Sequence, residues 1–196
     1  MVISRTKPLT IFTVGHSTRP IEEFIELLRA NGVKQLIDIR TIPKSRRNPQ
    51  FSSEALAASL AQADIDYVHM KALGGLRHPR KDSVNLGWRN ESFRGYADYM
   101  QTPEFNTALE AAIRLAAQKR TALMCAEAVP WRCHRSLVSD VLLSRGVDVL
   151  EIISDAAPKE HTLTPFARVE GARVTYPKAK DQLSLIDGAK QKSRSD

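Results

Sequence analysis

TALMCAEAVPWRCHRSLVSDVLLSR, residues 121–145, predicts a buried strand, a polar turn and a helix in immediate succession. The apolar run at 121–124 is typical of a strand, and the apolar spacing from Ser136 to Arg145 is helical. In open α/β sheets, ligands bind at the carboxyl ends of strands, where the next helix offers unpaired N–H groups to anions. The turn at 125–135 contains both cysteines of the chain and is therefore the first candidate for a functional site.

The same alternation of strands and helices extends along the chain from this stretch. Strands are expected at 11–14, 36–40, 65–69 and 149–153, and segments with helical spacing separate them. Strands that alternate with helices form right-handed crossovers and a parallel sheet covered on both faces. The sequence therefore predicts an α/β fold: a single three-layer domain with a mainly parallel sheet of about five strands flanked by helices, plus an irregular C-terminal extension.

Composition divides the chain into four segments. We expect an N-terminal extension at 1–9, the α/β domain at 10–154, a C-terminal extension at 155–178 that packs on the domain, and a disordered tail at 179–196. From about Asp155 the composition shifts to Pro, Lys, Ser, Asp and Gly, which is typical of segments outside a core. With 196 residues, 42% of them hydrophobic, the chain is long enough for one well-buried core.

The sequence argues against a membrane-spanning protein and against a secreted, disulfide-rich domain. No apolar run approaches the roughly 18 residues that a membrane span needs, and the first residues lack the apolar stretch of a signal peptide. The two cysteines lie eight positions apart and cannot form the framework of a secreted domain. We expect a cytoplasmic protein without a membrane partner, whose cysteines are thiols, metal ligands or a redox pair.

Positive charge gathers directly after predicted strands. The net charge of +7 favours acidic partners, first of all nucleic acid or a nucleotide, and Trp88 and Trp131 are placed in loops where they could stack on bases. The candidate substrate-binding or phosphate-binding residues are Arg40, Arg46, Arg47, Arg77, Arg132 and Arg135. The alternatives are a solvated basic surface and, for Arg40, a plain ion pair with Asp38, since the two residues project to the same side of a strand.

Several polar strand ends are expected to meet at one edge of the sheet. They contribute His16, Asp38 with Arg40, His69, and Cys125 with Glu127. The candidate catalytic residues are Cys125, Glu127, Cys133, His134 and His16. In this hypothesis Cys125 is a thiolate nucleophile or ligand, His134 an acid or base, and Glu127 a residue that orients another group. Arg132 or Arg135 would anchor an anion.

The cysteine turn has three alternative interpretations. Cys125, Cys133 and His134 could bind a metal, with zinc as the cofactor, although an adjacent Cys-His pair is not the usual zinc spacing. Cys125 and Cys133 could form a reversible disulfide if the loop curls. Both cysteines could instead be small buried packing residues. The spacing from Cys125 to Arg132 is one residue longer than the cysteine-to-arginine loop of thiol phosphatases, which argues against that activity.

The order of these motifs resembles the bacterial and archaeal "domain of unknown function 488" family. The resemblance spans about residues 10–186 and rests on Gly15-His16-Ser17, Asp38-Ile39-Arg40 with Pro43 and Ser45, Leu73-Gly74-Gly75, Tyr96-Ala97-Asp98-Tyr99-Met100, Cys125-Ala126-Glu127, Cys133-His134-Arg135, His161-Thr162-Leu163-Thr164-Pro165 and Thr175-Tyr176-Pro177. It implies a cytosolic α/β domain. It also supports a functional cluster at the cysteine turn, without supplying a reaction.

A second resemblance concerns the tail. Gln182, Leu183, Ser184, Leu185 and Ile186 look like the short peptide with which bacterial replication and repair proteins bind the DNA sliding clamp, except that Ile186 replaces phenylalanine. The expected partner-binding residues are Gln182, Leu183, Leu185 and Ile186. The alternative is that these apolar residues pack on the domain.

Three function classes follow from the sequence. The first is an enzyme that uses the cysteine turn on a nucleotide or nucleic-acid substrate. The second is a DNA-associated accessory or repair factor without catalytic activity, recruited through the tail. The third is a metal-binding or thiol redox protein.

Overall fold

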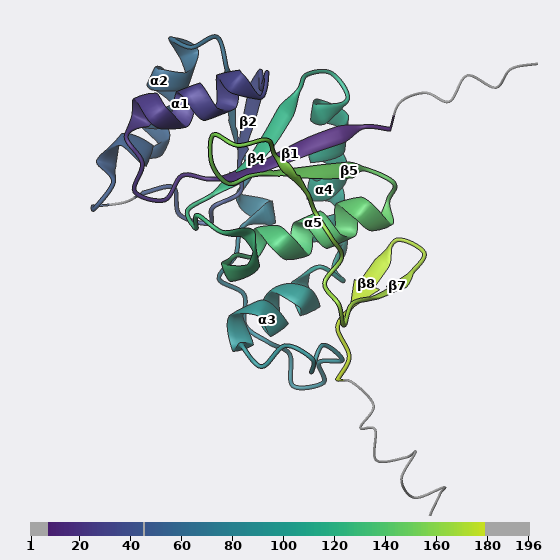
Figure 1. The fold of residues 1–196 in the computed structure, drawn as a ribbon. Coiled ribbons are helices and arrows are strands. Elements are labelled where there is room, and N and C mark those ends of the chain that lie inside the picture. Colours follow the sequence, from purple (N-terminus) through teal and green to yellow (C-terminus); the bar gives the residue numbers. More distant parts are fainter. Residues whose placement is uncertain (1–7, 45, 179–196) are drawn as a thin grey trace, which may run out of the picture.

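A six-stranded sheet forms the centre of the computed structural model, which describes residues 8–44 and 46–178 (Figure 1). Within these residues the strand order is β3-β2-β4-β1-β5-β6, and only β6 runs antiparallel to its neighbour. The strands are β1 (Thr10–Gly15), β2 (Gln35–Asp38), β3 (Asp66–His69), β4 (Thr121–Cys125), β5 (Asp148–Ile152) and β6 (Lys159–Glu160). The parallel strands bring their carboxyl ends to one edge, as the alternation in the sequence predicts.

Helices cover both faces of the sheet. On one face lie α1 (Ile21–Ala30) and α2 (Ser53–Ala61), and on the other α3 (Glu91–Tyr99), α4 (Pro103–Ala116) and α5 (Arg135–Ser144) (Figure 1). Short 3-10 helices occur at η1 (Pro49–Phe51), η2 (Lys71–Leu73) and η3 (Pro130–Arg132). The three-layer α/β fold expected from the sequence is confirmed.

Alternation along the strands divides the core between these two faces. Leu36 and Met124 pack with the α1 and α2 side chains, whereas Ile37, Leu123 and Cys125 pack with α4 and α5. Successive side chains of a strand point to opposite faces, so the two halves of the core follow from the strand pattern. This alternation also decides on which face each polar strand end lies.

The C-terminal extension is attached to α5 by a buried polar network. His161 lies between two carboxylates, with its Nδ1 2.7 Å from Glu151 and its Nε2 2.8 Å from Asp140. Tyr176 donates its hydroxyl to the other Asp140 oxygen at 2.7 Å, and Asp140 is fully buried. The extension adds strand β6 to the sheet and forms a hairpin of β7 (Arg168–Glu170) and β8 (Arg173–Thr175).

Stability should fall in alkaline solution as His161 loses its proton. Hydrogen bonds to Asp140 and Glu151 outweigh burial and raise the pKa of His161 from 6.5 to about 9. Because the folded pKa is raised, this stabilisation is fully present below pH 6.5 and is lost as the pH rises through about 9. Its size is on the order of 3 kcal/mol. Urea unfolding on both sides of this window measures it, and in His161→Gln the fall should vanish; an unchanged fall would contradict the assignment.

The long segment between β3 and α3 packs on the domain through side chains. Trp88, expected as a base-stacking residue, contacts Phe93, Phe166 and Tyr176 instead. Asp98 of α3 accepts hydrogen bonds from Ser83 and Asn85 and from the backbone of Arg80. The segment therefore joins α3 to the C-terminal extension.

Two expectations from the sequence concern residues outside the described part. The tail at 179–196, with Gln182, Leu183, Leu185 and Ile186, lies outside the described residues, as does most of the extension at 1–9.

In the described part of the chain, no helix combines the length and apolar character that a membrane span requires.

Candidate functional site

A cleft of about 520 Å³ opens at the carboxyl ends of β1, β2 and β4. Its walls come from the segments that follow these three strands. The lining residues are His16, Ser17, Thr18, Arg40, Ile42, Lys44, Asn48, Ala126, Glu127, Ala128, Val129 and Arg132. Three cationic side chains and a single carboxylate lie among them, so the cleft is suited to an anion.

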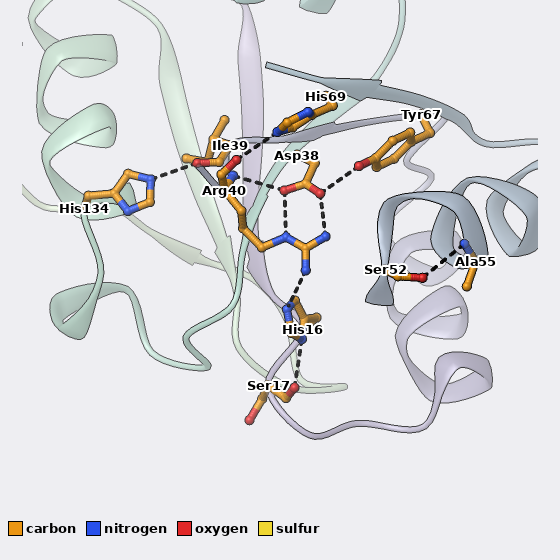
Figure 2. Close-up of polar contacts among 10 residues, drawn as sticks. All are labelled: His16, Ser17, Asp38, Ile39, Arg40, Ser52, Ala55, Tyr67, His69 and His134. Atoms are coloured by element: carbon orange, nitrogen blue, oxygen red, sulfur yellow. Dashed lines mark hydrogen bonds and ion pairs between the residues drawn. The ribbon is translucent and has the colours of Figure 1, made fainter. Parts of the chain in front are cut away.

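One wall of the cleft is a buried ion pair between Asp38 and Arg40. The Arg40 guanidinium donates from Nε to Asp38 Oδ1 at 2.8 Å and from Nη2 to Oδ2 at 2.5 Å (Figure 2). The Arg40 backbone N–H also donates to Oδ1, and Tyr67 donates its hydroxyl to Oδ2. The alternative of a plain ion pair is therefore the correct description of the Arg40 contacts, although Arg40 also lines the cleft.

His16 extends this network in its neutral form. Its Nδ1 lies 2.8 Å from the carbonyl oxygen of Ser17, so this nitrogen holds the proton and donates it. The Nε2 lone pair then accepts from Arg40 Nη1 at 3.2 Å (Figure 2). Burial, with the neighbouring guanidinium, lowers the pKa of His16 to about 4. Through Nε2, His16 joins the hydrogen-bond network of the Asp38–Arg40 ion pair.

The cleft floor is a close contact between the end of β1 and the segment after β4. His16 and Ser17 donate their backbone N–H groups to the carbonyls of Cys125 and Ala126. A Cβ atom at residue 15 would overlap the carbonyl oxygen of Glu127, so only glycine fits there. Ser17 has a φ of 51°, a left-handed conformation that is uncommon for serine.

Below this floor lies a buried thiol cluster. Cys125 belongs to the core on the α5 side of the sheet and does not line the cleft. The Arg135 guanidinium, itself buried, donates from Nη1 to Cys125 Sγ at 3.2 Å. It also donates to the carbonyl oxygens of Glu127 and Ala128, both at 3.3 Å. Arg135 thus joins the thiol to the backbone of the cleft floor.

The buried charge of Arg135 favours the thiolate form of Cys125. Within the described residues, Arg135 has no carboxylate partner, and its Nε has no hydrogen-bond acceptor. A buried cation is costly unless an anion compensates it. Burial alone raises the pKa of Cys125, but the hydrogen bond from Cys133 and the Arg135 charge lower it below its usual value. The same hydrogen bond raises the pKa of Cys133, so Cys133 keeps its proton.

His134 is held in place by both ring nitrogens. Its Nε2 donates to the carbonyl oxygen of Ile39 at 3.1 Å (Figure 2). Its Nδ1 lies 3.5 Å from Cys133 Sγ. Burial lowers the pKa of His134 to about 4. The Glu127 carboxylate makes no hydrogen bond to His134, so the structure does not support Glu127 as the group that orients this ring.

The structure separates the remaining candidates into two groups. His16, Arg40, Glu127 and Arg132 share the cleft. Arg46 and Arg47 are exposed and do not line the cleft. The Arg77 guanidinium lies over the Tyr99 ring, 3.5 Å from its centroid. His69 donates to the carbonyl oxygen of Arg40. Lys44 also lines the cleft but was not among the candidates predicted from the sequence. Its place in the basic run after β2 could have indicated it.

The cysteine turn does not fit zinc. The Cys125 sulfur accepts a hydrogen bond from the Arg135 guanidinium. His134 Nε2 donates to the carbonyl oxygen of Ile39. Among the described residues, no group of three or more His, Cys, Asp or Glu side chains is arranged to hold a metal ion. We derive no step through a metal at this turn.

The family of the chain follows from a comparison of its sequence with family models. A model described as "Domain of unknown function DUF488" matches residues 20–142. The chain belongs to this family. The resemblance inferred from the ordered motifs is thereby confirmed, over a shorter range than the sequence indicated. The match includes Asp38, Lys44, Cys125 and Arg132, while His16 precedes it. No curated protein and no solved structure matches the chain.

Proposed function

We propose that this DUF488 protein binds a phosphate-bearing ligand, a nucleotide or a nucleic acid, in the cleft at the carboxyl ends of β1, β2 and β4. The observation that supports this most directly is the convergence of Arg40, Lys44 and Arg132 in one open cleft whose lining includes a single carboxylate, Glu127. The net charge of +7 favours the same class of ligand.

The cations of the cleft divide between a fixed group and two adaptable groups. Arg40 is fixed by two hydrogen bonds to Asp38, which compensates its charge. Lys44 and Arg132 are exposed and line the cleft from the segments after β2 and after β4 respectively. Long exposed cations of this kind neutralise phosphates and fix their position, with binding that depends on salt.

Two exposed apolar side chains near these cations in the sequence favour a ligand with a base. Trp131 is 65% exposed and precedes Arg132, and Ile42, which lines the cleft, is 61% exposed. Large apolar side chains so exposed are available for contact with a ligand, and an indole ring stacks on nucleic-acid bases of any identity. The combination of cations that could bind phosphate and an exposed indole supports a nucleotide ligand over inorganic phosphate.

Cys125 is not part of this proposal, because its sulfur accepts from Arg135 and does not line the cleft. The cleft alone accounts for recognition of the ligand, and this applies equally to a catalytic protein and to an accessory factor.

Reversing the charges of Lys44 and Arg132 together should weaken binding of a fluorescent single-stranded oligonucleotide by at least about tenfold, and should lower the salt slope by about one per lost phosphate contact. Both side chains are exposed, so Lys44→Glu/Arg132→Glu should fold normally. Titrations at several salt concentrations, with ATP as a mononucleotide competitor, measure both effects.

Arg168→Glu is the matched control, since Arg168 is an exposed cation on the β7–β8 hairpin. It should leave the affinity almost unchanged apart from the small effect of net charge. The proposal would be wrong if neither the oligonucleotide nor ATP bound at low salt. It would also be wrong if Arg168→Glu lost as much affinity for the oligonucleotide as the double variant.

A further inference from the structure

Two consecutive carbonyl groups at the cleft floor point toward the same buried guanidinium. Arg135 donates from Nη1 to the carbonyl oxygen of Glu127 and from Nη2 to that of Ala128, both at 3.3 Å. The Glu127 oxygen also packs against Gly15, where a Cβ atom would lie only 1.8 Å from it. Arg135 is buried and does not line the cleft, so both carbonyl groups point away from the cleft.

The direction of these carbonyl groups fixes the direction of two backbone N–H groups. Every peptide bond among the described residues is trans, and in a trans peptide unit the N–H points opposite to the C=O. The N–H groups of Ala128 and Val129 therefore point away from Arg135, and both residues line the cleft. In the described part of the chain, neither N–H has a hydrogen-bond acceptor. Successive N–H groups that point the same way form a concave binding site for an anion.

Side chains of the same cleft supply positive charge and further donors. Lys44 and Arg132 are exposed cations that line it. Arg40 lines it as well, and of the five N–H donors of its guanidinium three are used on Asp38 and His16, so that two remain. The one carboxylate of the lining, on Glu127, is exposed and can turn into solvent.

We propose that the N–H groups of Ala128 and Val129 bind a terminal phosphate of the ligand, a phosphomonoester, with Lys44 and Arg132 as its counter-charges. This inference rests on the proposed function and deepens it, because it names the phosphorylated end of a nucleotide or of a nucleic-acid strand as the part that the cleft recognises.

A phosphomonoester suits this place better than the phosphodiester of a continuous strand. At pH 7 it carries a charge of about −1.5 to −2 and offers three acceptor oxygens, whereas each phosphate within a strand carries a single charge. The cleft, of about 520 Å³, has the size of a small-molecule pocket. A site of this size fits a mononucleotide or the last residue of a strand.

Two oligonucleotides of one sequence test the preference, one phosphorylated at both ends and the other with hydroxyl groups at both ends. Hydrogen bonds to a charged group are among the stronger ones, so the phosphorylated oligonucleotide should bind at least about tenfold more tightly at constant salt. Equal affinities would overturn the proposal.

Val129→Pro removes one of the two N–H donors and leaves every charge in place. The Val129 φ of −101° and ψ of 135° lie near the extended conformation of proline. The advantage of the phosphorylated oligonucleotide should fall at least about fivefold, while the affinity for the oligonucleotide with hydroxyl ends should stay the same. An undiminished advantage would overturn the proposal.

Val129→Ala is the matched control, because it shortens the side chain and keeps the N–H. It should retain the full advantage of the phosphorylated oligonucleotide. A loss as large as that of Val129→Pro would assign the effect to the side chain and would overturn the role of the N–H. Urea unfolding of both variants shows that they are folded.

Amide resonances of the isotope-labelled full chain give a measurement that needs no variant. Titration with inorganic phosphate should shift the amide protons of Ala128 and Val129 until the site is saturated, and chloride at the same ionic strength should not. Unmoved amides, or equal shifts with chloride, would overturn the proposal.

These measurements separate the inference from the proposed function. If both oligonucleotides bind alike and the two amides do not move, the cleft binds its ligand but the phosphate site is wrong. If phosphate moves the two amides and no nucleotide or oligonucleotide binds, the proposed function fails while the two N–H groups remain an anion site.

Discussion

Asp38→Ala is expected to lower the free energy of unfolding by about 3–5 kcal/mol, because it leaves a buried guanidinium without its anion. Asp38 is fully buried and accepts from Arg40 through two side-chain hydrogen bonds and one from the backbone. Arg40 is itself 7% exposed and cannot turn into water without moving the segment after β2. Urea unfolding, followed by circular dichroism, measures the loss.

Tyr67→Phe provides a graded control for this variant. It removes one hydrogen bond to Asp38 and keeps the ion pair, so it should cost only about 1 kcal/mol. Asp38→Leu/Arg40→Met, which removes both charges, should recover part of the loss of Asp38→Ala. Equal unfolding free energies for Asp38→Ala and Tyr67→Phe would show that Arg40 does not depend on its ion pair.

Cys125→Ala is expected to cost about 3–5 kcal/mol, far more than a buried cysteine side chain contributes by packing. The reason is the charge of Arg135, which has no carboxylate partner among the described residues and loses the Cys125 sulfur as an acceptor. Cys133→Ala removes a neutral thiol from the same cluster and should cost about 1 kcal/mol. Urea unfolding of the two variants under reducing conditions measures the difference.

Cys125→Ala/Arg135→Met separates charge from packing. If the thiolate compensates Arg135, removal of both groups should restore much of the stability that Cys125→Ala loses, because no buried charge remains uncompensated. Equal losses for Cys125→Ala and Cys133→Ala, with no recovery in the double variant, would mean that Cys125 is a packing residue.

Most of the fold could be predicted because its signals are local. The β-branched runs and helical stripes give the order of the elements, and the alternation gives a parallel sheet. The second strand was expected to reach Arg40 but ends at Asp38, since the Asp38 carboxylate turns back to the N–H of Arg40. Strand β6 was missed, because two residues are too few for a pattern.

The site could be located from the sequence, but its internal contacts could not. His16, Arg40 and Glu127 meet at one edge because parallel strands end there. The face on which each side chain lies depends on register, which places Asp38 beside Met124 and Cys125 beside Gly15. A shift of one residue would exchange the faces. The spacing of motifs therefore could not show that Asp38 and Cys125 lie on opposite sides of the sheet.

The sequence by itself determined the order of strands and helices, the sheet edge where the polar strand ends gather, and the presence of both cysteines and several arginines there. Only the tertiary structure decided which group each buried cation meets: Arg40 pairs with Asp38 in the wall of the cleft, and Arg135 donates to the Cys125 sulfur. The physical reason is that local spacing fixes periodicity, while a buried charge is compensated by whichever group the packing of distant segments places beside it.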